Sequence, residues 1–261
     1  MELWAPTSEV DHRRPAPLRS NTGMSFAELY ARHAIASFDK QVYLEAMLGR
    51  KRWSFDAQRG TLIFEDAHDQ ELELAVQVLG TESDEDASWL WAWANPAAGL
   101  PVRMLAAALE LKALGEREGI PELSRAEVPF GPGIDAGRIA AVASGVCRAG
   151  CFYRAPYPGG AIFMLIKDAK FRRFVTRPLP RIKRILPMFL SDTPVEDARA
   201  FYLHYLAFYR LTVKVDGQRV MASLGSAEPL LAVFDPPGRR LLSISGGDSP
   251  PSKFDVLRPG P

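Results

Sequence analysis

Three of the chain's five tryptophans occupy alternate positions in one short run, and this spacing constrains the fold more than any other feature. The run extends from Ser88 to Pro96, and its tryptophans are Trp89, Trp91 and Trp93. A period of two is typical of a β-strand, in which alternate side chains share one face of the sheet. On an α-helix the same positions would fan over more than half of the circumference. We therefore expect a strand whose indoles pack as core under a helix; an open aromatic platform that binds a partner or ligand is the alternative.

The remaining elements follow from apolar periodicity and from capping signals. A helix is predicted from Phe26 to about Met47, ending at Gly49, because Ser25 and Glu28 match a capping box. Further helices are predicted at 101–115, 135–149 and 194–209. Strands or extended segments are predicted at 52–55, 61–64, 71–79, 88–94, 122–130, 151–154, 161–166, 211–215, 219–224, 230–234 and 241–244.

Strands and helices come in blocks rather than in strict alternation, which argues against a parallel doubly wound sheet. We expect an α+β fold with antiparallel sheets and helices packed mainly on one face, and an arrangement in two parts is an open alternative. Residues 1–23 lack apolar periodicity and are expected to be a disordered leader, with Met24 as an alternative start. The expected segments after the leader are an α+β domain at 24–168, a basic connector at 169–192, a helix with an antiparallel meander at 193–246, and a tail at 247–261.

Charge and cysteine content narrow the class of protein. The net charge of +1 gives no global field that favours DNA or a membrane surface. Two cysteines, Cys147 and Cys151, exclude a disulfide scaffold and fit a reducing compartment. No apolar run approaches the roughly 20 residues that a membrane span requires. We expect a soluble, cytoplasmic protein with no membrane partner.

Most motifs that would carry metal, redox or phosphate chemistry are missing from the sequence. The two cysteines are four residues apart and do not form a C-x-x-C pair, so both are expected to pack as core. No phosphate loop and no nucleophile elbow is present. The histidines are scattered without a second ligand at metal spacing: His12, His33, His68 and His204. We expect no metal and no cofactor.

Acidic side chains offer two weaker hypotheses. The turn at 81–86 contains Glu82, Asp84, Glu85 and Asp86, and we expect a solvated loop that keeps an edge from pairing, with a divalent-cation site as the alternative. An enzyme would have to assemble its site from dispersed residues such as Glu73, Arg154 and Asn95.

The segment 167–184 is the one strong charge feature. It contains eight cations against Asp168 alone. Pro178 and Pro180 within it and Pro187 just after it predict that no long helix forms. Such a segment can contact an acidic protein surface or grip phosphates, and a plain solvated linker is the third alternative. The candidate partner-binding residues are Lys170, Arg172, Arg173, Arg177, Arg181, Lys183 and Arg184.

Several short motifs in a fixed order resemble an uncharacterised bacterial family marked by a W-x-W-A-N sequence. They are the helix at 26–48 with Gln41, Val78-Leu79-Gly80, the run from Trp89 to Asn95, the helix end at 111–116, and Tyr153-Arg154-Ala155-Pro156. The resemblance covers residues 25–168. It implies a bacterial, intracellular α+β protein and carries no known activity.

Together these observations favour a non-enzymatic protein-binding module, with an immunity-like or adaptor-like role as its sharpest form. We expect a protein partner and at most weak, sequence-blind binding of nucleic acid through the basic segment. An enzyme with a dispersed site and a nucleic-acid-binding protein are the competing classes.

Overall fold

The computed structural model describes residues 24–49, 51–68, 70–169, 171 and 177–247. The predicted leader at 1–23 and nearly all of the predicted tail lie outside these residues. The described chain is an α+β protein with antiparallel sheets, as predicted. No helix in the described ranges is long and apolar enough to cross a lipid bilayer.

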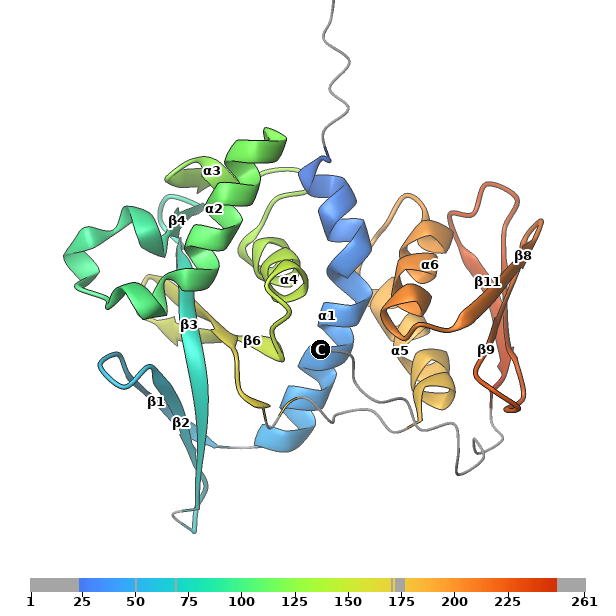
Figure 1. Cartoon of the computed structure of the whole chain (residues 1–261), viewed down its shortest axis with the longest axis horizontal. Helices are drawn as coiled ribbons and strands as arrows, with labels where there is room; N and C mark the ends of the chain where they lie inside the picture. The colour runs from blue at the N-terminus through green and yellow to red at the C-terminus, as the bar shows by residue number, and fades with distance from the viewer. Residues whose placement is uncertain (1–23, 50, 69, 170, 172–176, 248–261) are drawn as a thin grey trace, which may run out of the picture.

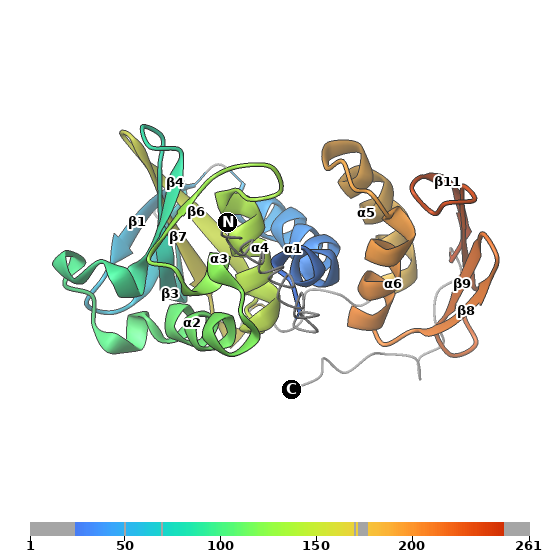
Figure 2. The same cartoon turned by 90° about the horizontal axis from the view of Figure 1, so that it is seen from above.

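The molecule has two sheets at its opposite ends with helices between them (Figures 1 and 2). Seen from above, the first sheet is followed by α4 and α1, then by α5 and α6, and then by the second sheet. Helix α1 (Phe26–Leu48) therefore lies at the centre, and its side chains enter the apolar clusters on both sides. Its capping box is confirmed, because Ser25 Oγ accepts a hydrogen bond from the N–H of Glu28 and the Glu28 carboxylate accepts one from the N–H of Ser25.

The first sheet is built around the long strand β3 (Glu71–Ser83). Strands β1 (Arg52–Asp56) and β2 (Thr61–Glu65) form a hairpin on the first half of β3. On the second half, β3 pairs with β4 (Ser88–Trp91) and with β7 (Gly160–Ile166). The short strand β5 (Glu127–Pro129) extends the sheet from β4, and β6 (Cys151–Tyr157) extends it from β7. All of these pairs are antiparallel, as predicted.

Helices α2 (Ala106–Glu118) and α4 (Ala136–Val146) contribute to the same apolar cluster as the sheet and α1. The tryptophan strand lies under them and is shorter than predicted, since it ends at Trp91. Trp89 and Trp91 are fully buried, with ring centroids 5.3 Å apart, and the Trp91 indole N–H donates to the carbonyl of Glu122. Trp93 instead belongs to a short 3-10 helix, η1 (Ala92–Ala94). Its position corrects the prediction of three indoles on one strand face.

The 3-10 turns η2 (Pro96–Ala98) and η3 (Val102–Met104) connect this strand to α2. Helix α2 was predicted to end at Gly115, but it continues to Glu118. A Cβ at Gly115 would lie 2.8 Å from the carbonyl oxygen of Ile120 and 2.7 Å from the side chain of Leu123, at the short helix α3 (Pro121–Ser124). This glycine therefore permits close packing inside the helix and does not end it.

The second unit consists of two helices on a four-stranded sheet. Strands β8 (Thr212–Asp216), β9 (Arg219–Ser223), β10 (Leu230–Phe234) and β11 (Leu241–Gly246) pair in the order β11-β10-β9-β8. These strands agree with the predicted meander. Helices α5 (Pro178–Asp192) and α6 (Ala198–Phe208) cover one face of this sheet and also contact α1.

The prediction that prolines break the basic segment is wrong for residues 178–192. Pro178 and Pro180 lie in the first turn of α5, where backbone N–H groups have no acceptor within the helix. Pro187 lies on the exposed side, while Leu179, Ile182 and Leu186 are buried in the second unit. Helix α6 begins after Asp197, which caps it, and not at the predicted residue 194, which directly follows the C-cap of α5.

Candidate functional site

A cleft of about 460 Å³ opens at one end of the first sheet, beside the turn between β3 and β4 and the first turn of α4. Its walls come from β3, β6, β7 and α4, which are distant in sequence. We call it the acidic cleft. It is lined by Glu82, Ser83, Asp84, Ala87, Phe130, Asp135, Ala136, Gly137, Phe152, Arg154 and Phe163.

One ion pair connects two strands in the acidic cleft. The guanidinium of Arg154, on β6, donates through both Nε and Nη2 to the carboxylate of Glu82, on β3, with Nε 3.0 Å from the oxygen. The Glu82 side chain is mostly buried, whereas that of Arg154 is about half exposed. The hydrogen bond that Arg154 donates to Glu82 raises the pKa of Arg154. The pair therefore fixes both side chains and cancels one negative charge of the cleft.

Two further carboxylates belong to the cleft. Asp135 caps α4 by accepting from the N–H of Arg138 at 2.8 Å, and its carboxylate also lies 3.3 Å from the Arg138 guanidinium. Asp84 is exposed, and among the residues that the structure describes it forms no ion pair within 4.0 Å. Asp84 is therefore the carboxylate that can accept an incoming cation without breaking a pair.

The walls of the cleft are aromatic. Phe163 is buried, and Phe130 and Phe152 are half-buried. Phe152 and Phe163 lie with ring centroids 6.2 Å apart, and Phe163 contacts the ring of Trp89. Ring faces attract cations, and carboxylates complete the recognition of a guanidinium or ammonium group. The acidic cleft thus has the chemistry of a site for a basic side chain.

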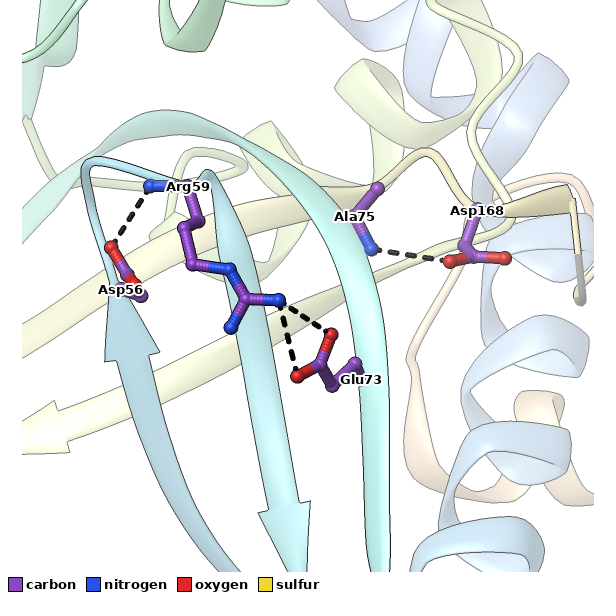
Figure 3. A network of polar contacts seen from close by, with 5 residues as sticks. All are labelled: Asp56, Arg59, Glu73, Ala75 and Asp168. Atoms are coloured by element: carbon purple, nitrogen blue, oxygen red, sulfur yellow. Dashed lines mark hydrogen bonds and ion pairs between the residues drawn. The ribbon is translucent and has the colours of Figure 1, made fainter.

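The three residues of the dispersed enzyme hypothesis do not meet. Glu73 lies near the start of β3, where its carboxylate pairs with Arg59 at 3.0 Å, beside the turn that Asp56 stabilises (Figure 3). Arg154 on β6 is paired with Phe163 on β7, which in turn is paired with Gly80 on β3. The interval from 73 to 80 is about 23 Å of strand, and it separates Glu73 from Arg154 along the sheet. Asn95 follows η1, on the other side of β3 from β6.

The basic segment divides into residues with different environments. Arg177, which directly precedes α5, and Arg184, within α5, are exposed, and Lys183 is half-buried. Asp168, its one acid, accepts from the N–H of Ala75 on β3 at 3.2 Å (Figure 3). The remaining candidates Lys170, Arg172 and Arg173 lie outside the described residues.

Arg181 lies within the protein and is bound to a buried acid. Its Nε donates to Asp39 Oδ1 and its Nη2 donates to the Asp39 carbonyl at 2.9 Å, which joins α5 to α1. The hydroxyls of Tyr205 and Tyr209, on α6 and directly after it, donate to Asp39 Oδ2. Burial raises the pKa of both tyrosines, so both remain protonated donors at neutral pH. Arg181 therefore holds the two units together rather than facing a partner.

Both cysteines are packed as core. Cys147 and Cys151 are free and buried, and burial raises the pKa of the Cys147 thiol to about 12. Within the described ranges no group of three His, Cys, Asp or Glu residues could hold a metal ion.

Sequence reasoning missed the aromatic walls of the acidic cleft and the buried role of Asp39. The walls come from separate elements, so no spacing predicts them. Asp39 did leave a signal, since the charged residues Asp39 and Lys40 stand in the middle of the predominantly apolar helix at 26–48.

Comparison with known proteins identifies the family but no activity. A search of curated proteins and a search of solved structures each found no match. The model of a family of unknown function, DUF6882, matches residues 27–169, which include α1, the first sheet and the whole acidic cleft. The chain therefore belongs to the DUF6882 family.

Proposed function

We propose that this protein is a non-enzymatic protein-binding module whose acidic cleft receives a basic side chain of its partner. The observation that carries the proposal is the combination of three phenylalanines with the carboxylates of Glu82, Asp84 and Asp135 in one cleft. Two of those carboxylates are held by neighbouring arginines, and Asp84 is available at the rim. An arginine side chain can stack on the rings while its guanidinium donates to Asp84.

The acids around the cleft add long-range attraction. Glu85 and Asp86 follow Asp84 in the same exposed turn, so the rim is negative beyond the pocket itself. A basic segment of a partner protein would be guided to this rim by charge and held by its anchor side chain. The most specific role that we propose for this module is that of an immunity protein or an adaptor. We place it in the bacterial cytoplasm, which its two free, buried cysteines support.

The binding step can be tested with small probes before any partner is known. The probes are three capped tripeptides, Gly-X-Gly, in which X is arginine, lysine or citrulline. Citrulline has the shape of arginine without its charge. We expect arginine and lysine peptides to shift the amide NMR signals of Asp84, Ala136 and Gly137 in a saturable way, and citrulline to shift none of them.

Two variants compare the charge of Asp84, which lines the cleft, with the charge of Glu85, which does not. Asp84→Asn keeps the shape of the side chain and removes its charge, so it should abolish the shifts. Glu85→Gln removes one charge from the same turn at a residue that does not line the cleft, so it should leave most of the affinity. Equal shifts with citrulline, or unchanged binding by Asp84→Asn, would contradict the proposal.

A further inference from the structure

Strand β8 is an edge of the second sheet, at the end of the molecule opposite the first sheet, and no other strand of the described residues pairs with its outer side (Figure 2). All five of its residues are exposed. In an antiparallel ladder, alternate residues direct their backbone N–H and C=O groups away from the neighbouring strand. Along β8 these groups face away from β9, and such an edge can accept a further strand.

Two exposed apolar side chains of β8 lie on the face of the sheet that packs against the helices. Val213 is paired with Ala222, and Val215 with Val220, and directly paired residues share one face of a sheet. Ala222 and Val220 are fully buried, whereas Val213 is 36% and Val215 is 50% exposed. Helices α5 and α6 therefore cover β9 but leave the valines of β8 largely uncovered.

The turn determines which peptide groups point outward. Asp216 and Arg219 are paired across the two-residue turn at Gly217 and Gln218. The pair that flanks such a turn carries the hydrogen bonds of the hairpin, so the peptide groups of Val215 point to the open edge. A two-fold axis beside Val215 would place two copies of this residue in a hydrogen-bonded pair.

We propose that the occupant of this edge is β8 of a second copy of the chain, antiparallel and centred on Val215. In this register Lys214 of each copy lies opposite Asp216 of the other, so two complementary charge pairs form on the outer face. The two copies of Val215 meet on the inner face, and Val213 of each copy lies diagonal to Val215 of the other. An axis at Lys214 would place two lysines opposite each other. An axis at Val213 would place Lys214 opposite Thr212 and Asp216 opposite Arg210, which precedes the strand and has a positive φ of 54°, so no charge pair would form within β8.

The resulting dimer joins two four-stranded sheets into one continuous sheet. Because the first sheet, which carries the acidic cleft, lies at the end of the molecule opposite β8, the dimer would carry its two clefts on its two outer ends, which suits bivalent attachment to a repeated or oligomeric partner. The dimer stands independently of the proposed function, since it uses a different surface.

The test is the mass of the full chain by analytical ultracentrifugation from 1 to 100 µM, a range set by the typical affinity of modest interfaces, on the order of micromolar. The wild type should reach twice its 28.9 kDa. Lys214→Asp and Asp216→Lys should each be monomeric, because each places like charges opposite each other. Mixing the two variants should restore the dimer, because one copy then carries two acids on β8 and its partner carries two lysines there.

Arg239→Glu is the matched control, since it reverses an exposed charge on the loop between β10 and β11 and should leave the mass unchanged. Thermal melts verify that all variants fold, as expected for exposed positions. A wild type that stays monomeric at 100 µM, or variants that do not respond to mixing, would overturn the proposal; the tripeptide titration is read separately and is unaffected by either outcome.

Discussion

At the scale of single residues, Asp39 matters most, because it is fully buried and bound by side chains from two other elements. Removing one partner of a buried ion pair leaves a charge without compensation. We predict that Asp39→Ala and Arg181→Ala each lower the free energy of unfolding by about 3–5 kcal/mol. Urea denaturation measures this. The double variant should cost clearly less than the sum of the two, and simple additivity would show that the pair is not the coupled element described here.

Trp91 and Trp93 differ in burial despite their equivalent positions in the sequence motif. Trp91 is fully buried and bonded to Glu122, whereas Trp93 is half-buried, with the Lys112 ammonium 4.4 Å from its ring centroid. Trp91→Ala should therefore cost about 3–5 kcal/mol of stability, and Trp93→Ala distinctly less. Denaturant midpoints of the two variants give the comparison. Equal losses would mean that all three indoles are core, as the sequence alone predicts.

His33 couples stability to pH. Burial, helped by Arg32, Lys40 and His204, lowers the pKa of His33 to about 4. The unfolded chain binds a proton near pH 6.5, so the stability contributed by neutral His33 is present above that pH and is lost as the pH falls toward 4. The loss is at most roughly 3 kcal/mol, and water around its exposed part reduces it.

The variant His33→Gln should flatten the dependence of unfolding free energy on pH between 6.5 and 4. Urea curves at pH 7.5, 5.5 and 4.5 measure it. A wild type equally stable at all three values would show that His33 is not held neutral by the fold.

At the scale of elements, α5 shows where reading the sequence fails and why. Proline content predicts a broken segment, yet an apolar stripe and tertiary contacts with α1 and α6 form the helix. The only interior proline, Pro187, lies on the exposed side, and it removes a backbone N–H from the helix ladder. Pro187→Ala should therefore stabilise the protein by about 1–3 kcal/mol, while Pro178→Ala in the first turn should be nearly neutral. Thermal melts compare them, and destabilisation by Pro187→Ala would contradict this account.

In other elements too, features set by neighbouring residues could be predicted, whereas features set by contacts with distant residues could not. Capping by Ser25 and Glu28 predicts the start of α1 because the signal is local. The ends of the tryptophan strand and of α2 depend on contacts with distant residues, so they could not be predicted. For the acidic cleft, Glu82, Asp84 and Arg154 were singled out individually, but only strand register and α4 bring them to one wall.

At the scale of the molecule, the two units share α1, whereas the family match ends at residue 169. The face of α1 that contains Ala34 and Ile35 belongs to the apolar cluster of the second unit, in which α1 packs against α5 and α6. A fragment of residues 24–169 should therefore unfold at lower denaturant and self-associate. Urea midpoints and light scattering compare it with the full chain. A monomeric fragment of undiminished stability would show that the second unit is dispensable to the fold.

Photo-crosslinking in the cells that make the protein tests whether a partner protein inserts a basic side chain into the acidic cleft. Phe130, a half-buried wall of the cleft, is replaced by p-benzoyl-phenylalanine, and exposed Phe208 on α6 is the matched control. We predict a specific protein adduct at position 130 only, attached within a few residues of an arginine or lysine and lost with Asp84→Asn. The same adducts at both positions, or an adduct that persists in Asp84→Asn, would contradict the claim.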